Sequence, residues 1–171
     1  MKKIEELIRD IPDFPKAGIQ FKDITPLLQD PERVREAVTS FAKSLEGKTI
    51  HKVVGIEARG FLFGMLLAEK LNAGFVPIRK PGKLPYKTFS EEYDLEYGSN
   101  TLEIHQDAIK KGENVIIHDD VLATGGTAEA ACKLVERMGG NIVECNFIME
   151  LSFLNGADKL KDYKLHSLIT Y

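Results

Sequence analysis

The chain has 171 residues, which is enough for one domain with a sizeable core. Its net charge of −3 argues against non-specific nucleic-acid binding as its main function. Two cysteines are too few for a disulfide framework, no signal peptide opens the chain, and no apolar run approaches the ~18 residues of a membrane span. We therefore expect a cytoplasmic protein that binds neither membrane nor nucleic acid.

The first part of the chain predicts two helices separated by an irregular segment. Apolar residues at helical spacing indicate a short amphipathic helix over residues 4–11. Residues 13–26 contain Pro15, Gly18 and Pro26, follow directly on Pro12, and are predicted to be irregular. Asp30 then caps a helix that has Pro31 at its first position.

The middle of the chain alternates strands and helices. A strand over residues 51–57 and a tight turn are followed by a helix over residues 61–71. This helix is apolar nearly all round, so it is expected to be buried. A second strand covers residues 75–79, and residues 82–100 read as a long mobile loop or a loose hairpin.

Four more strands and one helix are predicted in the second half. The strands cover residues 101–105, 114–118, 142–151 and 165–170, and the helix follows residue 127. This alternation indicates an α/β fold with a mainly parallel sheet, in which ligands bind beyond the carboxyl ends of the strands.

Residues 115–127 carry the clearest functional signal. An apolar run ends in Asp119 and Asp120, and a loop of small residues leads directly into an amphipathic helix. The first amides of a helix lack partners and bind phosphate without needing a lysine. The loop consists of Ala123, Thr124, Gly125, Gly126 and Thr127. Its glycines can approach an anion closely, and its threonines can donate hydroxyls and cap the helix.

Other phosphate-binding motifs do not fit this stretch. A Walker loop requires a lysine after the second glycine, and a dinucleotide fingerprint requires another glycine spacing. Because carboxylates repel phosphate, ribose hydroxyls or a magnesium ion on a pyrophosphate should separate the two aspartates from it. The plain alternative is a buried strand followed by an ordinary turn with solvated acids.

A second functional signal is a cluster of basic residues. Residues 78–87 contain four cations in an otherwise acidic chain. A local basic segment suits a small polyanionic substrate, although a solvated basic turn is equally compatible with it.

The strand, the two acids and the Thr-Gly-Gly-Thr loop resemble the type I phosphoribosyltransferases, which bind phosphoribosyl pyrophosphate with these elements. The resemblance implies an α/β fold with a mainly parallel twisted sheet flanked by helices and a small hood from the N-terminal segment. It implies one domain over residues 1–171, with the N-terminal helix and hood in residues 1–30 and a flexible catalytic loop in residues 82–100. Residues 13–28 and 59–64 and the Leu-Glu-Tyr-Gly at 95–98 resemble the adenine-using members of the family.

The resemblance also implies the role of each site residue. The loop 123–127 would bind the 5-phosphate, Asp119 and Asp120 would face the ribose hydroxyls, and Arg59 would hold pyrophosphate. Arg79, Lys80 and Lys83 would lie near the diphosphate. Phe21 and Leu151 would stack on adenine, and the backbone of Gln20 to Lys22 would read the edge of the base. Glu96 would transfer a proton, and Tyr97 would close the site.

The implied reaction is Mg²⁺-dependent transfer of the phosphoribosyl group to adenine, giving AMP and pyrophosphate in purine salvage. Mg²⁺ would be held by substrate oxygens and water, with no direct protein ligand. The resemblance further implies a homodimer. His118 stands where an apolar strand residue is expected, and we assign it no catalytic role.

Several alternatives remain open. Phe21 and Leu151 are compatible with plain core positions, Arg59 with a helix cap or a pair with Glu57, and Tyr97 with a surface aromatic. The base can be hypoxanthine, guanine or xanthine. A non-catalytic regulator of this fold should carry an added DNA-binding domain or a basic face, and a receiver-type signalling domain should carry its paired acids early in the chain.

Overall fold

The computed structural model describes residues 3–94 and 99–171, with only the backbone of Asp94. At its centre lies a parallel sheet of five strands in the order β4-β3-β7-β8-β9. The strands are β3 (Lys52–Ile56), β4 (Gly74–Ile78), β7 (Asn114–Leu122), β8 (Asn141–Glu150) and β9 (Leu165–Thr170). The predicted α/β fold with a mainly parallel sheet is confirmed.

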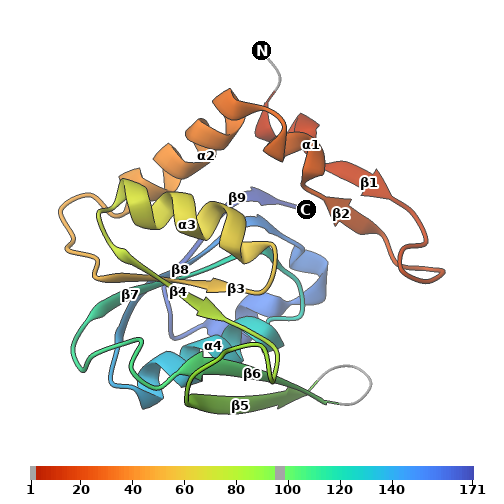
Figure 1. Cartoon of the computed structure of the whole chain (residues 1–171). Coiled ribbons are helices and arrows are strands. Elements are labelled where there is room, and N and C mark those ends of the chain that lie inside the picture. The colour runs from red at the N-terminus through yellow and green to blue at the C-terminus, as the bar shows by residue number, and fades with distance from the viewer. Residues whose placement is uncertain (1–2, 95–98) are drawn as a thin grey trace.

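Helices cover both faces of this sheet (Figure 1). On one face lie α2 (Pro31–Ser44) and α3 (Gly60–Lys70), whose apolar residues share a core with β3 and β7. On the other face lie α4 (Gly126–Arg137) and the antiparallel hairpin of β5 (Thr88–Asp94) and β6 (Ser99–His105). The expected cap of α2 is present, because the Asp30 carboxylate accepts hydrogen bonds from the amides of Glu32 and Arg33.

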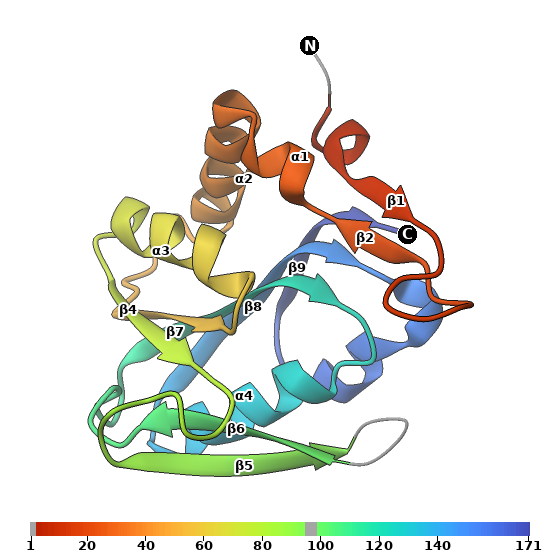
Figure 2. The same cartoon turned by 45° about the vertical axis from the view of Figure 1, so that its right-hand side comes forward.

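The N-terminal segment forms a hood beside the sheet (Figure 2). A 3₁₀ helix, η1 (Ile4–Leu7), leads into an antiparallel pair, β1 (Arg9–Ile11) and β2 (Phe21–Asp23), and α1 (Thr25–Leu28) follows. The predicted helix over residues 4–11 is therefore wrong beyond Leu7, and residues 13–26 are not irregular throughout. Pairing between distant strands decides the conformation here, and an ion pair of 2.6 Å between Arg9 and Asp23 strengthens it.

Three further expectations need correction. The helix α3 is not buried all round, because Leu62, Met65 and Leu66 are 44%, 54% and 44% exposed. Residues 82–100 were expected to form either a long loop or a loose hairpin. The hairpin is confirmed, because Thr88–Asp94 and the residues from Ser99 on are paired strands and not loop. The strand β7 continues past the two aspartates to Leu122.

Two 3₁₀ helices were not anticipated. They are η2 (Ser152–Leu154) and η3 (Gly156–Leu160), and they connect β8 to β9. Among the described residues, no helix combines the length and apolar character needed to cross a bilayer.

Candidate functional site

The site lies where the connections of the sheet diverge. From β3 the chain passes outward to β4, whereas β7 is followed by β8 and β9 on the other side. Ligands of open α/β sheets bind beyond the carboxyl ends of the two strands that flank such a point. Glu57 and Arg59 follow β3, and Asp119 and Asp120 lie near the end of β7, so these charged residues meet at this edge of the sheet.

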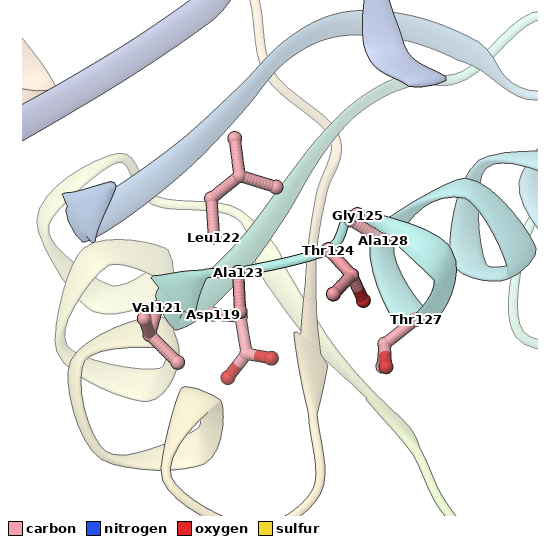
Figure 3. Close-up of a pocket in the computed structure, with 8 residues that line it drawn as sticks. All are labelled: Asp119, Val121, Leu122, Ala123, Thr124, Gly125, Thr127 and Ala128. Atoms are coloured by element: carbon pink, nitrogen blue, oxygen red, sulfur yellow. The ribbon is translucent and has the colours of Figure 1, made fainter. Parts of the chain in front are cut away.

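A small cavity opens between the end of β7 and the start of α4 (Figure 3). It has a volume of about 130 Å³ and is lined by Asp119, Val121, Leu122, Ala123, Thr124, Gly125, Thr127 and Ala128. The residue before α4 is Gly125, with a φ of 80°, and the free amides of the first helical turn follow it. Neither Thr124 nor Thr127 caps α4, so that part of the prediction is wrong. Both threonines instead line the cavity.

The loop rests on a glycine that the sequence interpretation missed. A Cβ atom at Gly125 would overlap the carbonyl oxygen of Gly156, and a Cβ at Gly156 would overlap that of Ala123. Backbone therefore packs directly on backbone beneath the loop. The Asn155-Gly156 pair is a recognisable turn signal, but nothing in the local sequence connects it with a loop thirty residues earlier.

The two aspartates have different surroundings. Asp119 lines the cavity, and its Oδ1 accepts a hydrogen bond of 2.8 Å from the amide of Asp120. The side chain of Asp120 is 3% exposed, and its Oδ2 lies 2.9 Å from Nε of Arg59. Burial and the neighbouring Asp120 carboxylate raise the pKa of Asp119, and burial raises the pKa of Asp120 against the opposing effect of Arg59. Each carboxyl therefore favours a proton donor or a cation as its partner.

Arg59 joins the acid pair to the hood. It occupies the N-cap position of α3 but makes no side-chain capping hydrogen bond, and its ion pair is with Asp120 and not with Glu57, so the alternative pairing is wrong. Its guanidinium carbon lies 4.8 Å from the centre of the Phe21 ring, while Phe14 contacts the same ring edge-on at 5.1 Å. The aromatic ring predicted to stack on the base is thus already in contact with the arginine predicted to hold pyrophosphate.

A larger hollow of about 560 Å³ adjoins the loop. Four of its lining residues are those predicted to contact the base: Gln20, Phe21, Lys22 and Leu151. The others come from the hood, the turn before α3, the end of β7, the small-residue loop and η2, namely Gly18, Ile19, Arg59, Val121, Ala123, Thr124, Phe153 and Leu154. The exposed Phe153 and Ile19 at this hollow were not predicted as site residues.

The basic residues after β4 gather around one carboxylate, Glu57. It accepts from Nε of Arg79 at 3.3 Å and from the amide of Lys80 at 3.0 Å, and it forms an ion pair with Lys83. Burial alone would raise its pKa, but the hydrogen bonds from Lys83, Lys80 and Arg79 lower the pKa of Glu57 to about 2. Glu57 was missed as a site residue, although its place after a strand is the available signal.

His118 lies inside the sheet and not at its end. Its Nδ1 is 2.6 Å from the side-chain oxygen of Asn146, and its ring packs edge-on against Phe41. Burial lowers the pKa of His118 to about 4, so the ring is neutral at pH 7.

The predicted proton-transfer residue Glu96 and the predicted closing residue Tyr97 lie outside the described residues. Within the described ranges, no group of three or more histidine, cysteine, aspartate or glutamate side chains is placed to hold a metal ion.

A parallel α/β sheet with a small-residue loop before a helix at its switch point, two acids and an adjoining hollow defines an enzyme class that acts on phosphorylated sugars. The sequence pattern of the Phosphoribosyl transferase domain matches residues 25–168. The chain belongs to the phosphoribosyltransferase family and has the type I fold of that family.

Individual relatives are similar over nearly their whole length. An adenine phosphoribosyltransferase of Christiangramia forsetii is 64% identical over 169 residues, which covers 99% of each chain. The crystal structure of an adenine phosphoribosyltransferase from Thermoanaerobacter pseudethanolicus superimposes with a TM-score of 0.95 at 54% identity and 98% coverage of both chains. The Saccharomyces cerevisiae enzyme, in complex with adenine and an iminoaltritol bisphosphate, is similar with a TM-score of 0.92 at 44% identity and 96% coverage of both chains.

Proposed function

We propose that this protein transfers the phosphoribosyl group of phosphoribosyl pyrophosphate to adenine and releases AMP and pyrophosphate. One observation carries the proposal: a hollow lined by Phe21 and Leu151 opens directly beside the small-residue loop 123–127. A base seated in the hollow is then next to a sugar whose phosphate sits on the loop. The names of the similar enzymes, and the adenine bound to the yeast one, support adenine as the base.

The phosphate and ribose side uses backbone amides, two threonine hydroxyls and the carboxylate of Asp119. Amides of the loop, the first turn of α4 and the hydroxyls of Thr124 and Thr127 hold the 5-phosphate. Asp119 faces the same cavity and accepts hydrogen bonds from ribose hydroxyls. Hydroxyls are proton donors, so they satisfy a buried carboxylate that a phosphate would repel.

On the pyrophosphate side, the cationic side chains leave their carboxylate partners and bind the diphosphate instead. Arg59 turns from Asp120 to the diphosphate, and the Asp120 carboxylate then becomes available to the second ribose hydroxyl. Arg79, Lys80 and Lys83 lie on the neighbouring segment, where Glu57 keeps them gathered until the diphosphate arrives. Cations placed around the leaving group stabilise the negative charge that develops as the glycosidic bond breaks.

On the base side, Phe21 and Leu151 sandwich the purine, and the backbone of Gln20 to Lys22 reads its edge. The aromatic ring supplies stacking area, whereas the backbone groups supply directional hydrogen bonds. Glu96 takes the proton that adenine loses as its N9 attacks the anomeric carbon, and Tyr97 closes the site against water.

Mg²⁺ is the proposed cofactor, and the substrate's pyrophosphate oxygens and water would hold it. The chemistry it would supply is neutralisation of charge on the diphosphate leaving group. The Asp119 carboxylate at the cavity can accept hydrogen bonds from metal-bound water, so the residues present fit a metal that the substrate carries.

We further propose a cytoplasmic homodimer. Cys132 and Cys145 are free and buried, which suits a reducing compartment. The exposed apolar face of α3, formed by Leu62, Met65 and Leu66, suits burial against a second copy of the chain. Sedimentation of the wild type and of a Met65→Glu variant tests this, and a monomeric wild type would contradict it.

The decisive experiment follows radiolabelled adenine into AMP. Product should form only when phosphoribosyl pyrophosphate and Mg²⁺ are both present, and hypoxanthine, guanine and xanthine should react far more slowly. Preference for another base would replace adenine while retaining the reaction, and no product with any base would indicate a regulator.

Glu96→Gln tests the assigned proton transfer. It should lower kcat by about 10²–10⁴-fold and leave substrate KM values nearly unchanged, because a general acid–base group acts in the transition state. An unchanged kcat would remove Glu96 from the chemistry.

A further inference from the structure

The two walls of the base hollow come from distant parts of the chain. The hood contributes Phe21 and Lys22, and the segment after β8 contributes Leu151. Both walls lie beside the last residue, Tyr171, and the C-terminus is drawn next to β2 in both views (Figures 1 and 2).

The backbone of Tyr171 brackets Leu151. Its amide donates a hydrogen bond of 2.9 Å to the carbonyl of Glu150. Its carbonyl accepts from the amide of Ser152 at 3.0 Å and from the Ser152 hydroxyl at 2.5 Å. Because the residues before and after Leu151 are both tied to Tyr171, the position of the Leu151 side chain depends on that of Tyr171.

The ring of Tyr171 engages the hood. The Lys22 ammonium lies 3.7 Å from the ring centre and 2.6 Å from Oδ1 of Asp10, its partner across the β1–β2 pair. Only 13% of the Lys22 side chain is exposed, so this ammonium sits in a shielded position where a cation–π contact is strongest. The hood thus meets the end of the sheet through Lys22.

We infer that Tyr171 is a positioning residue for the base, because it fixes the separation between the hood wall and the Leu151 wall of the hollow. The inference deepens the proposed function and rests on it. It also assigns the Lys22 side chain to anchoring the hood, so that only the backbone of Lys22 is left to read the base.

The test separates the ring of Tyr171 from its backbone. Tyr171→Leu keeps the backbone hydrogen bonds and removes the ring, so KM for adenine should rise roughly 3- to 20-fold, the range expected for loss of a shielded cation–π contact. Neither KM for phosphoribosyl pyrophosphate nor kcat should change by more than about two-fold. Tyr171→Phe keeps the ring and should behave as the wild type.

Two controls distinguish positioning from general loss of stability. Tyr163→Leu removes a tyrosine whose hydroxyl bonds Glu136 at 2.9 Å and which does not line the hollow, so it should lower Tm without changing KM for adenine. Lys22→Met should raise KM for adenine. Adding Tyr171→Leu to it should have little further effect, because both changes remove the same contact between the Lys22 ammonium and the Tyr171 ring. An unchanged KM for adenine in Tyr171→Leu, or an equal rise in both KM values, would overturn the inference.

Amide hydrogen exchange separates this inference from the proposed function. A wild type that forms no AMP defeats the function alone. Exchange of the amides of β1 and β2 should then still be faster in Tyr171→Leu than in Tyr171→Phe, and equal rates would defeat the anchoring role.

Discussion

The proposed phosphate side and the proposed base side of the site are built in different ways. The phosphate side is one continuous stretch of backbone, from Asp119 through the loop into α4, that rests on the backbone of Gly156. The base side is assembled from side chains of the hood, Arg59 and the segment after β8. A backbone site is rigid and local in sequence, whereas a side-chain site depends on how distant segments meet.

The strongest test of the phosphate side is Gly125→Ala. The residue has a φ of 80°, and its new Cβ would overlap the Gly156 carbonyl, so the loop must move away from Gly156 and lose the conformation that presents its amides. We expect a loss of ~10³-fold in kcat/KM for phosphoribosyl pyrophosphate, about 4 kcal/mol of transition-state stabilisation. Steady-state kinetics measures this loss.

Gly47→Ala is the matched control. Gly47 also has a positive φ of 76°, but a Cβ atom added there would meet nothing within 4 Å, so only backbone strain is added. Its kinetics should match the wild type. Normal substrate binding by Gly125→Ala would show that the phosphate does not sit on this loop.

The buried ring of His118, which precedes the two aspartates in β7, should make the stability of the fold depend on pH. Its pKa of about 4 lies below the ordinary histidine value of 6.5, so the unfolded chain binds the proton first as pH falls. Stability from this group is complete above pH 6.5 and is lost between about pH 6.5 and 4, which amounts to about 3 kcal/mol.

His118→Gln should remove this loss, because glutamine does not titrate. Denaturant unfolding of both proteins at pH 7 and pH 4 gives the difference. Parallel pH dependence in the two proteins would mean that His118 is not held neutral in the fold.

Arg59→Ala affects both sides of the site at once. Pyrophosphate should inhibit the variant about 30-fold more weakly, roughly 2 kcal/mol, because a charge-assisted contact is lost. The exposed Arg35 on α2 is the control, since Arg35→Ala removes the same charge outside the site. Equal inhibition of Arg59→Ala and the wild type would leave Arg59 only its structural contacts with Asp120 and Phe21.

The smallest effect is expected at the base. Phe21→Ala should raise KM for adenine about 10-fold, near 1.4 kcal/mol, and leave KM for phosphoribosyl pyrophosphate unchanged, because stacking area is lost on one substrate alone. Phe21→Tyr should retain binding. If both KM values rise together in Phe21→Ala, the ring serves the fold and not the base.

The same contrast explains what could be predicted from the sequence. The strand, the acids, the loop and α4 follow one another along the chain, so local spacing was enough to place them. The hood strands depend on pairing between Arg9 and Asp23, and that pairing leaves no local pattern. The exposed face of α3 could not be distinguished from a buried one, because apolar side chains on the surface and in the core give the same sequence pattern.

Residues that act through others were also missed. Glu57, Gly156 and Tyr171 carry no motif, and each matters because of what a distant segment brings to it. The family resemblance implied roles for residues expected to touch substrate, and the structure was needed to find those that pack behind them.

The carboxylate of Glu57 has one more consequence, for the departure of product. An anion that enters the basic cluster must compete with a carboxylate already bound to Arg79 and Lys83. In the proposed reaction, Glu57 pairs with both cations again once the bond to the sugar has broken, and this loosens the hold on the departing diphosphate. A carboxylate that competes in this way favours release of the product and weakens the binding of free inorganic phosphate to the cluster.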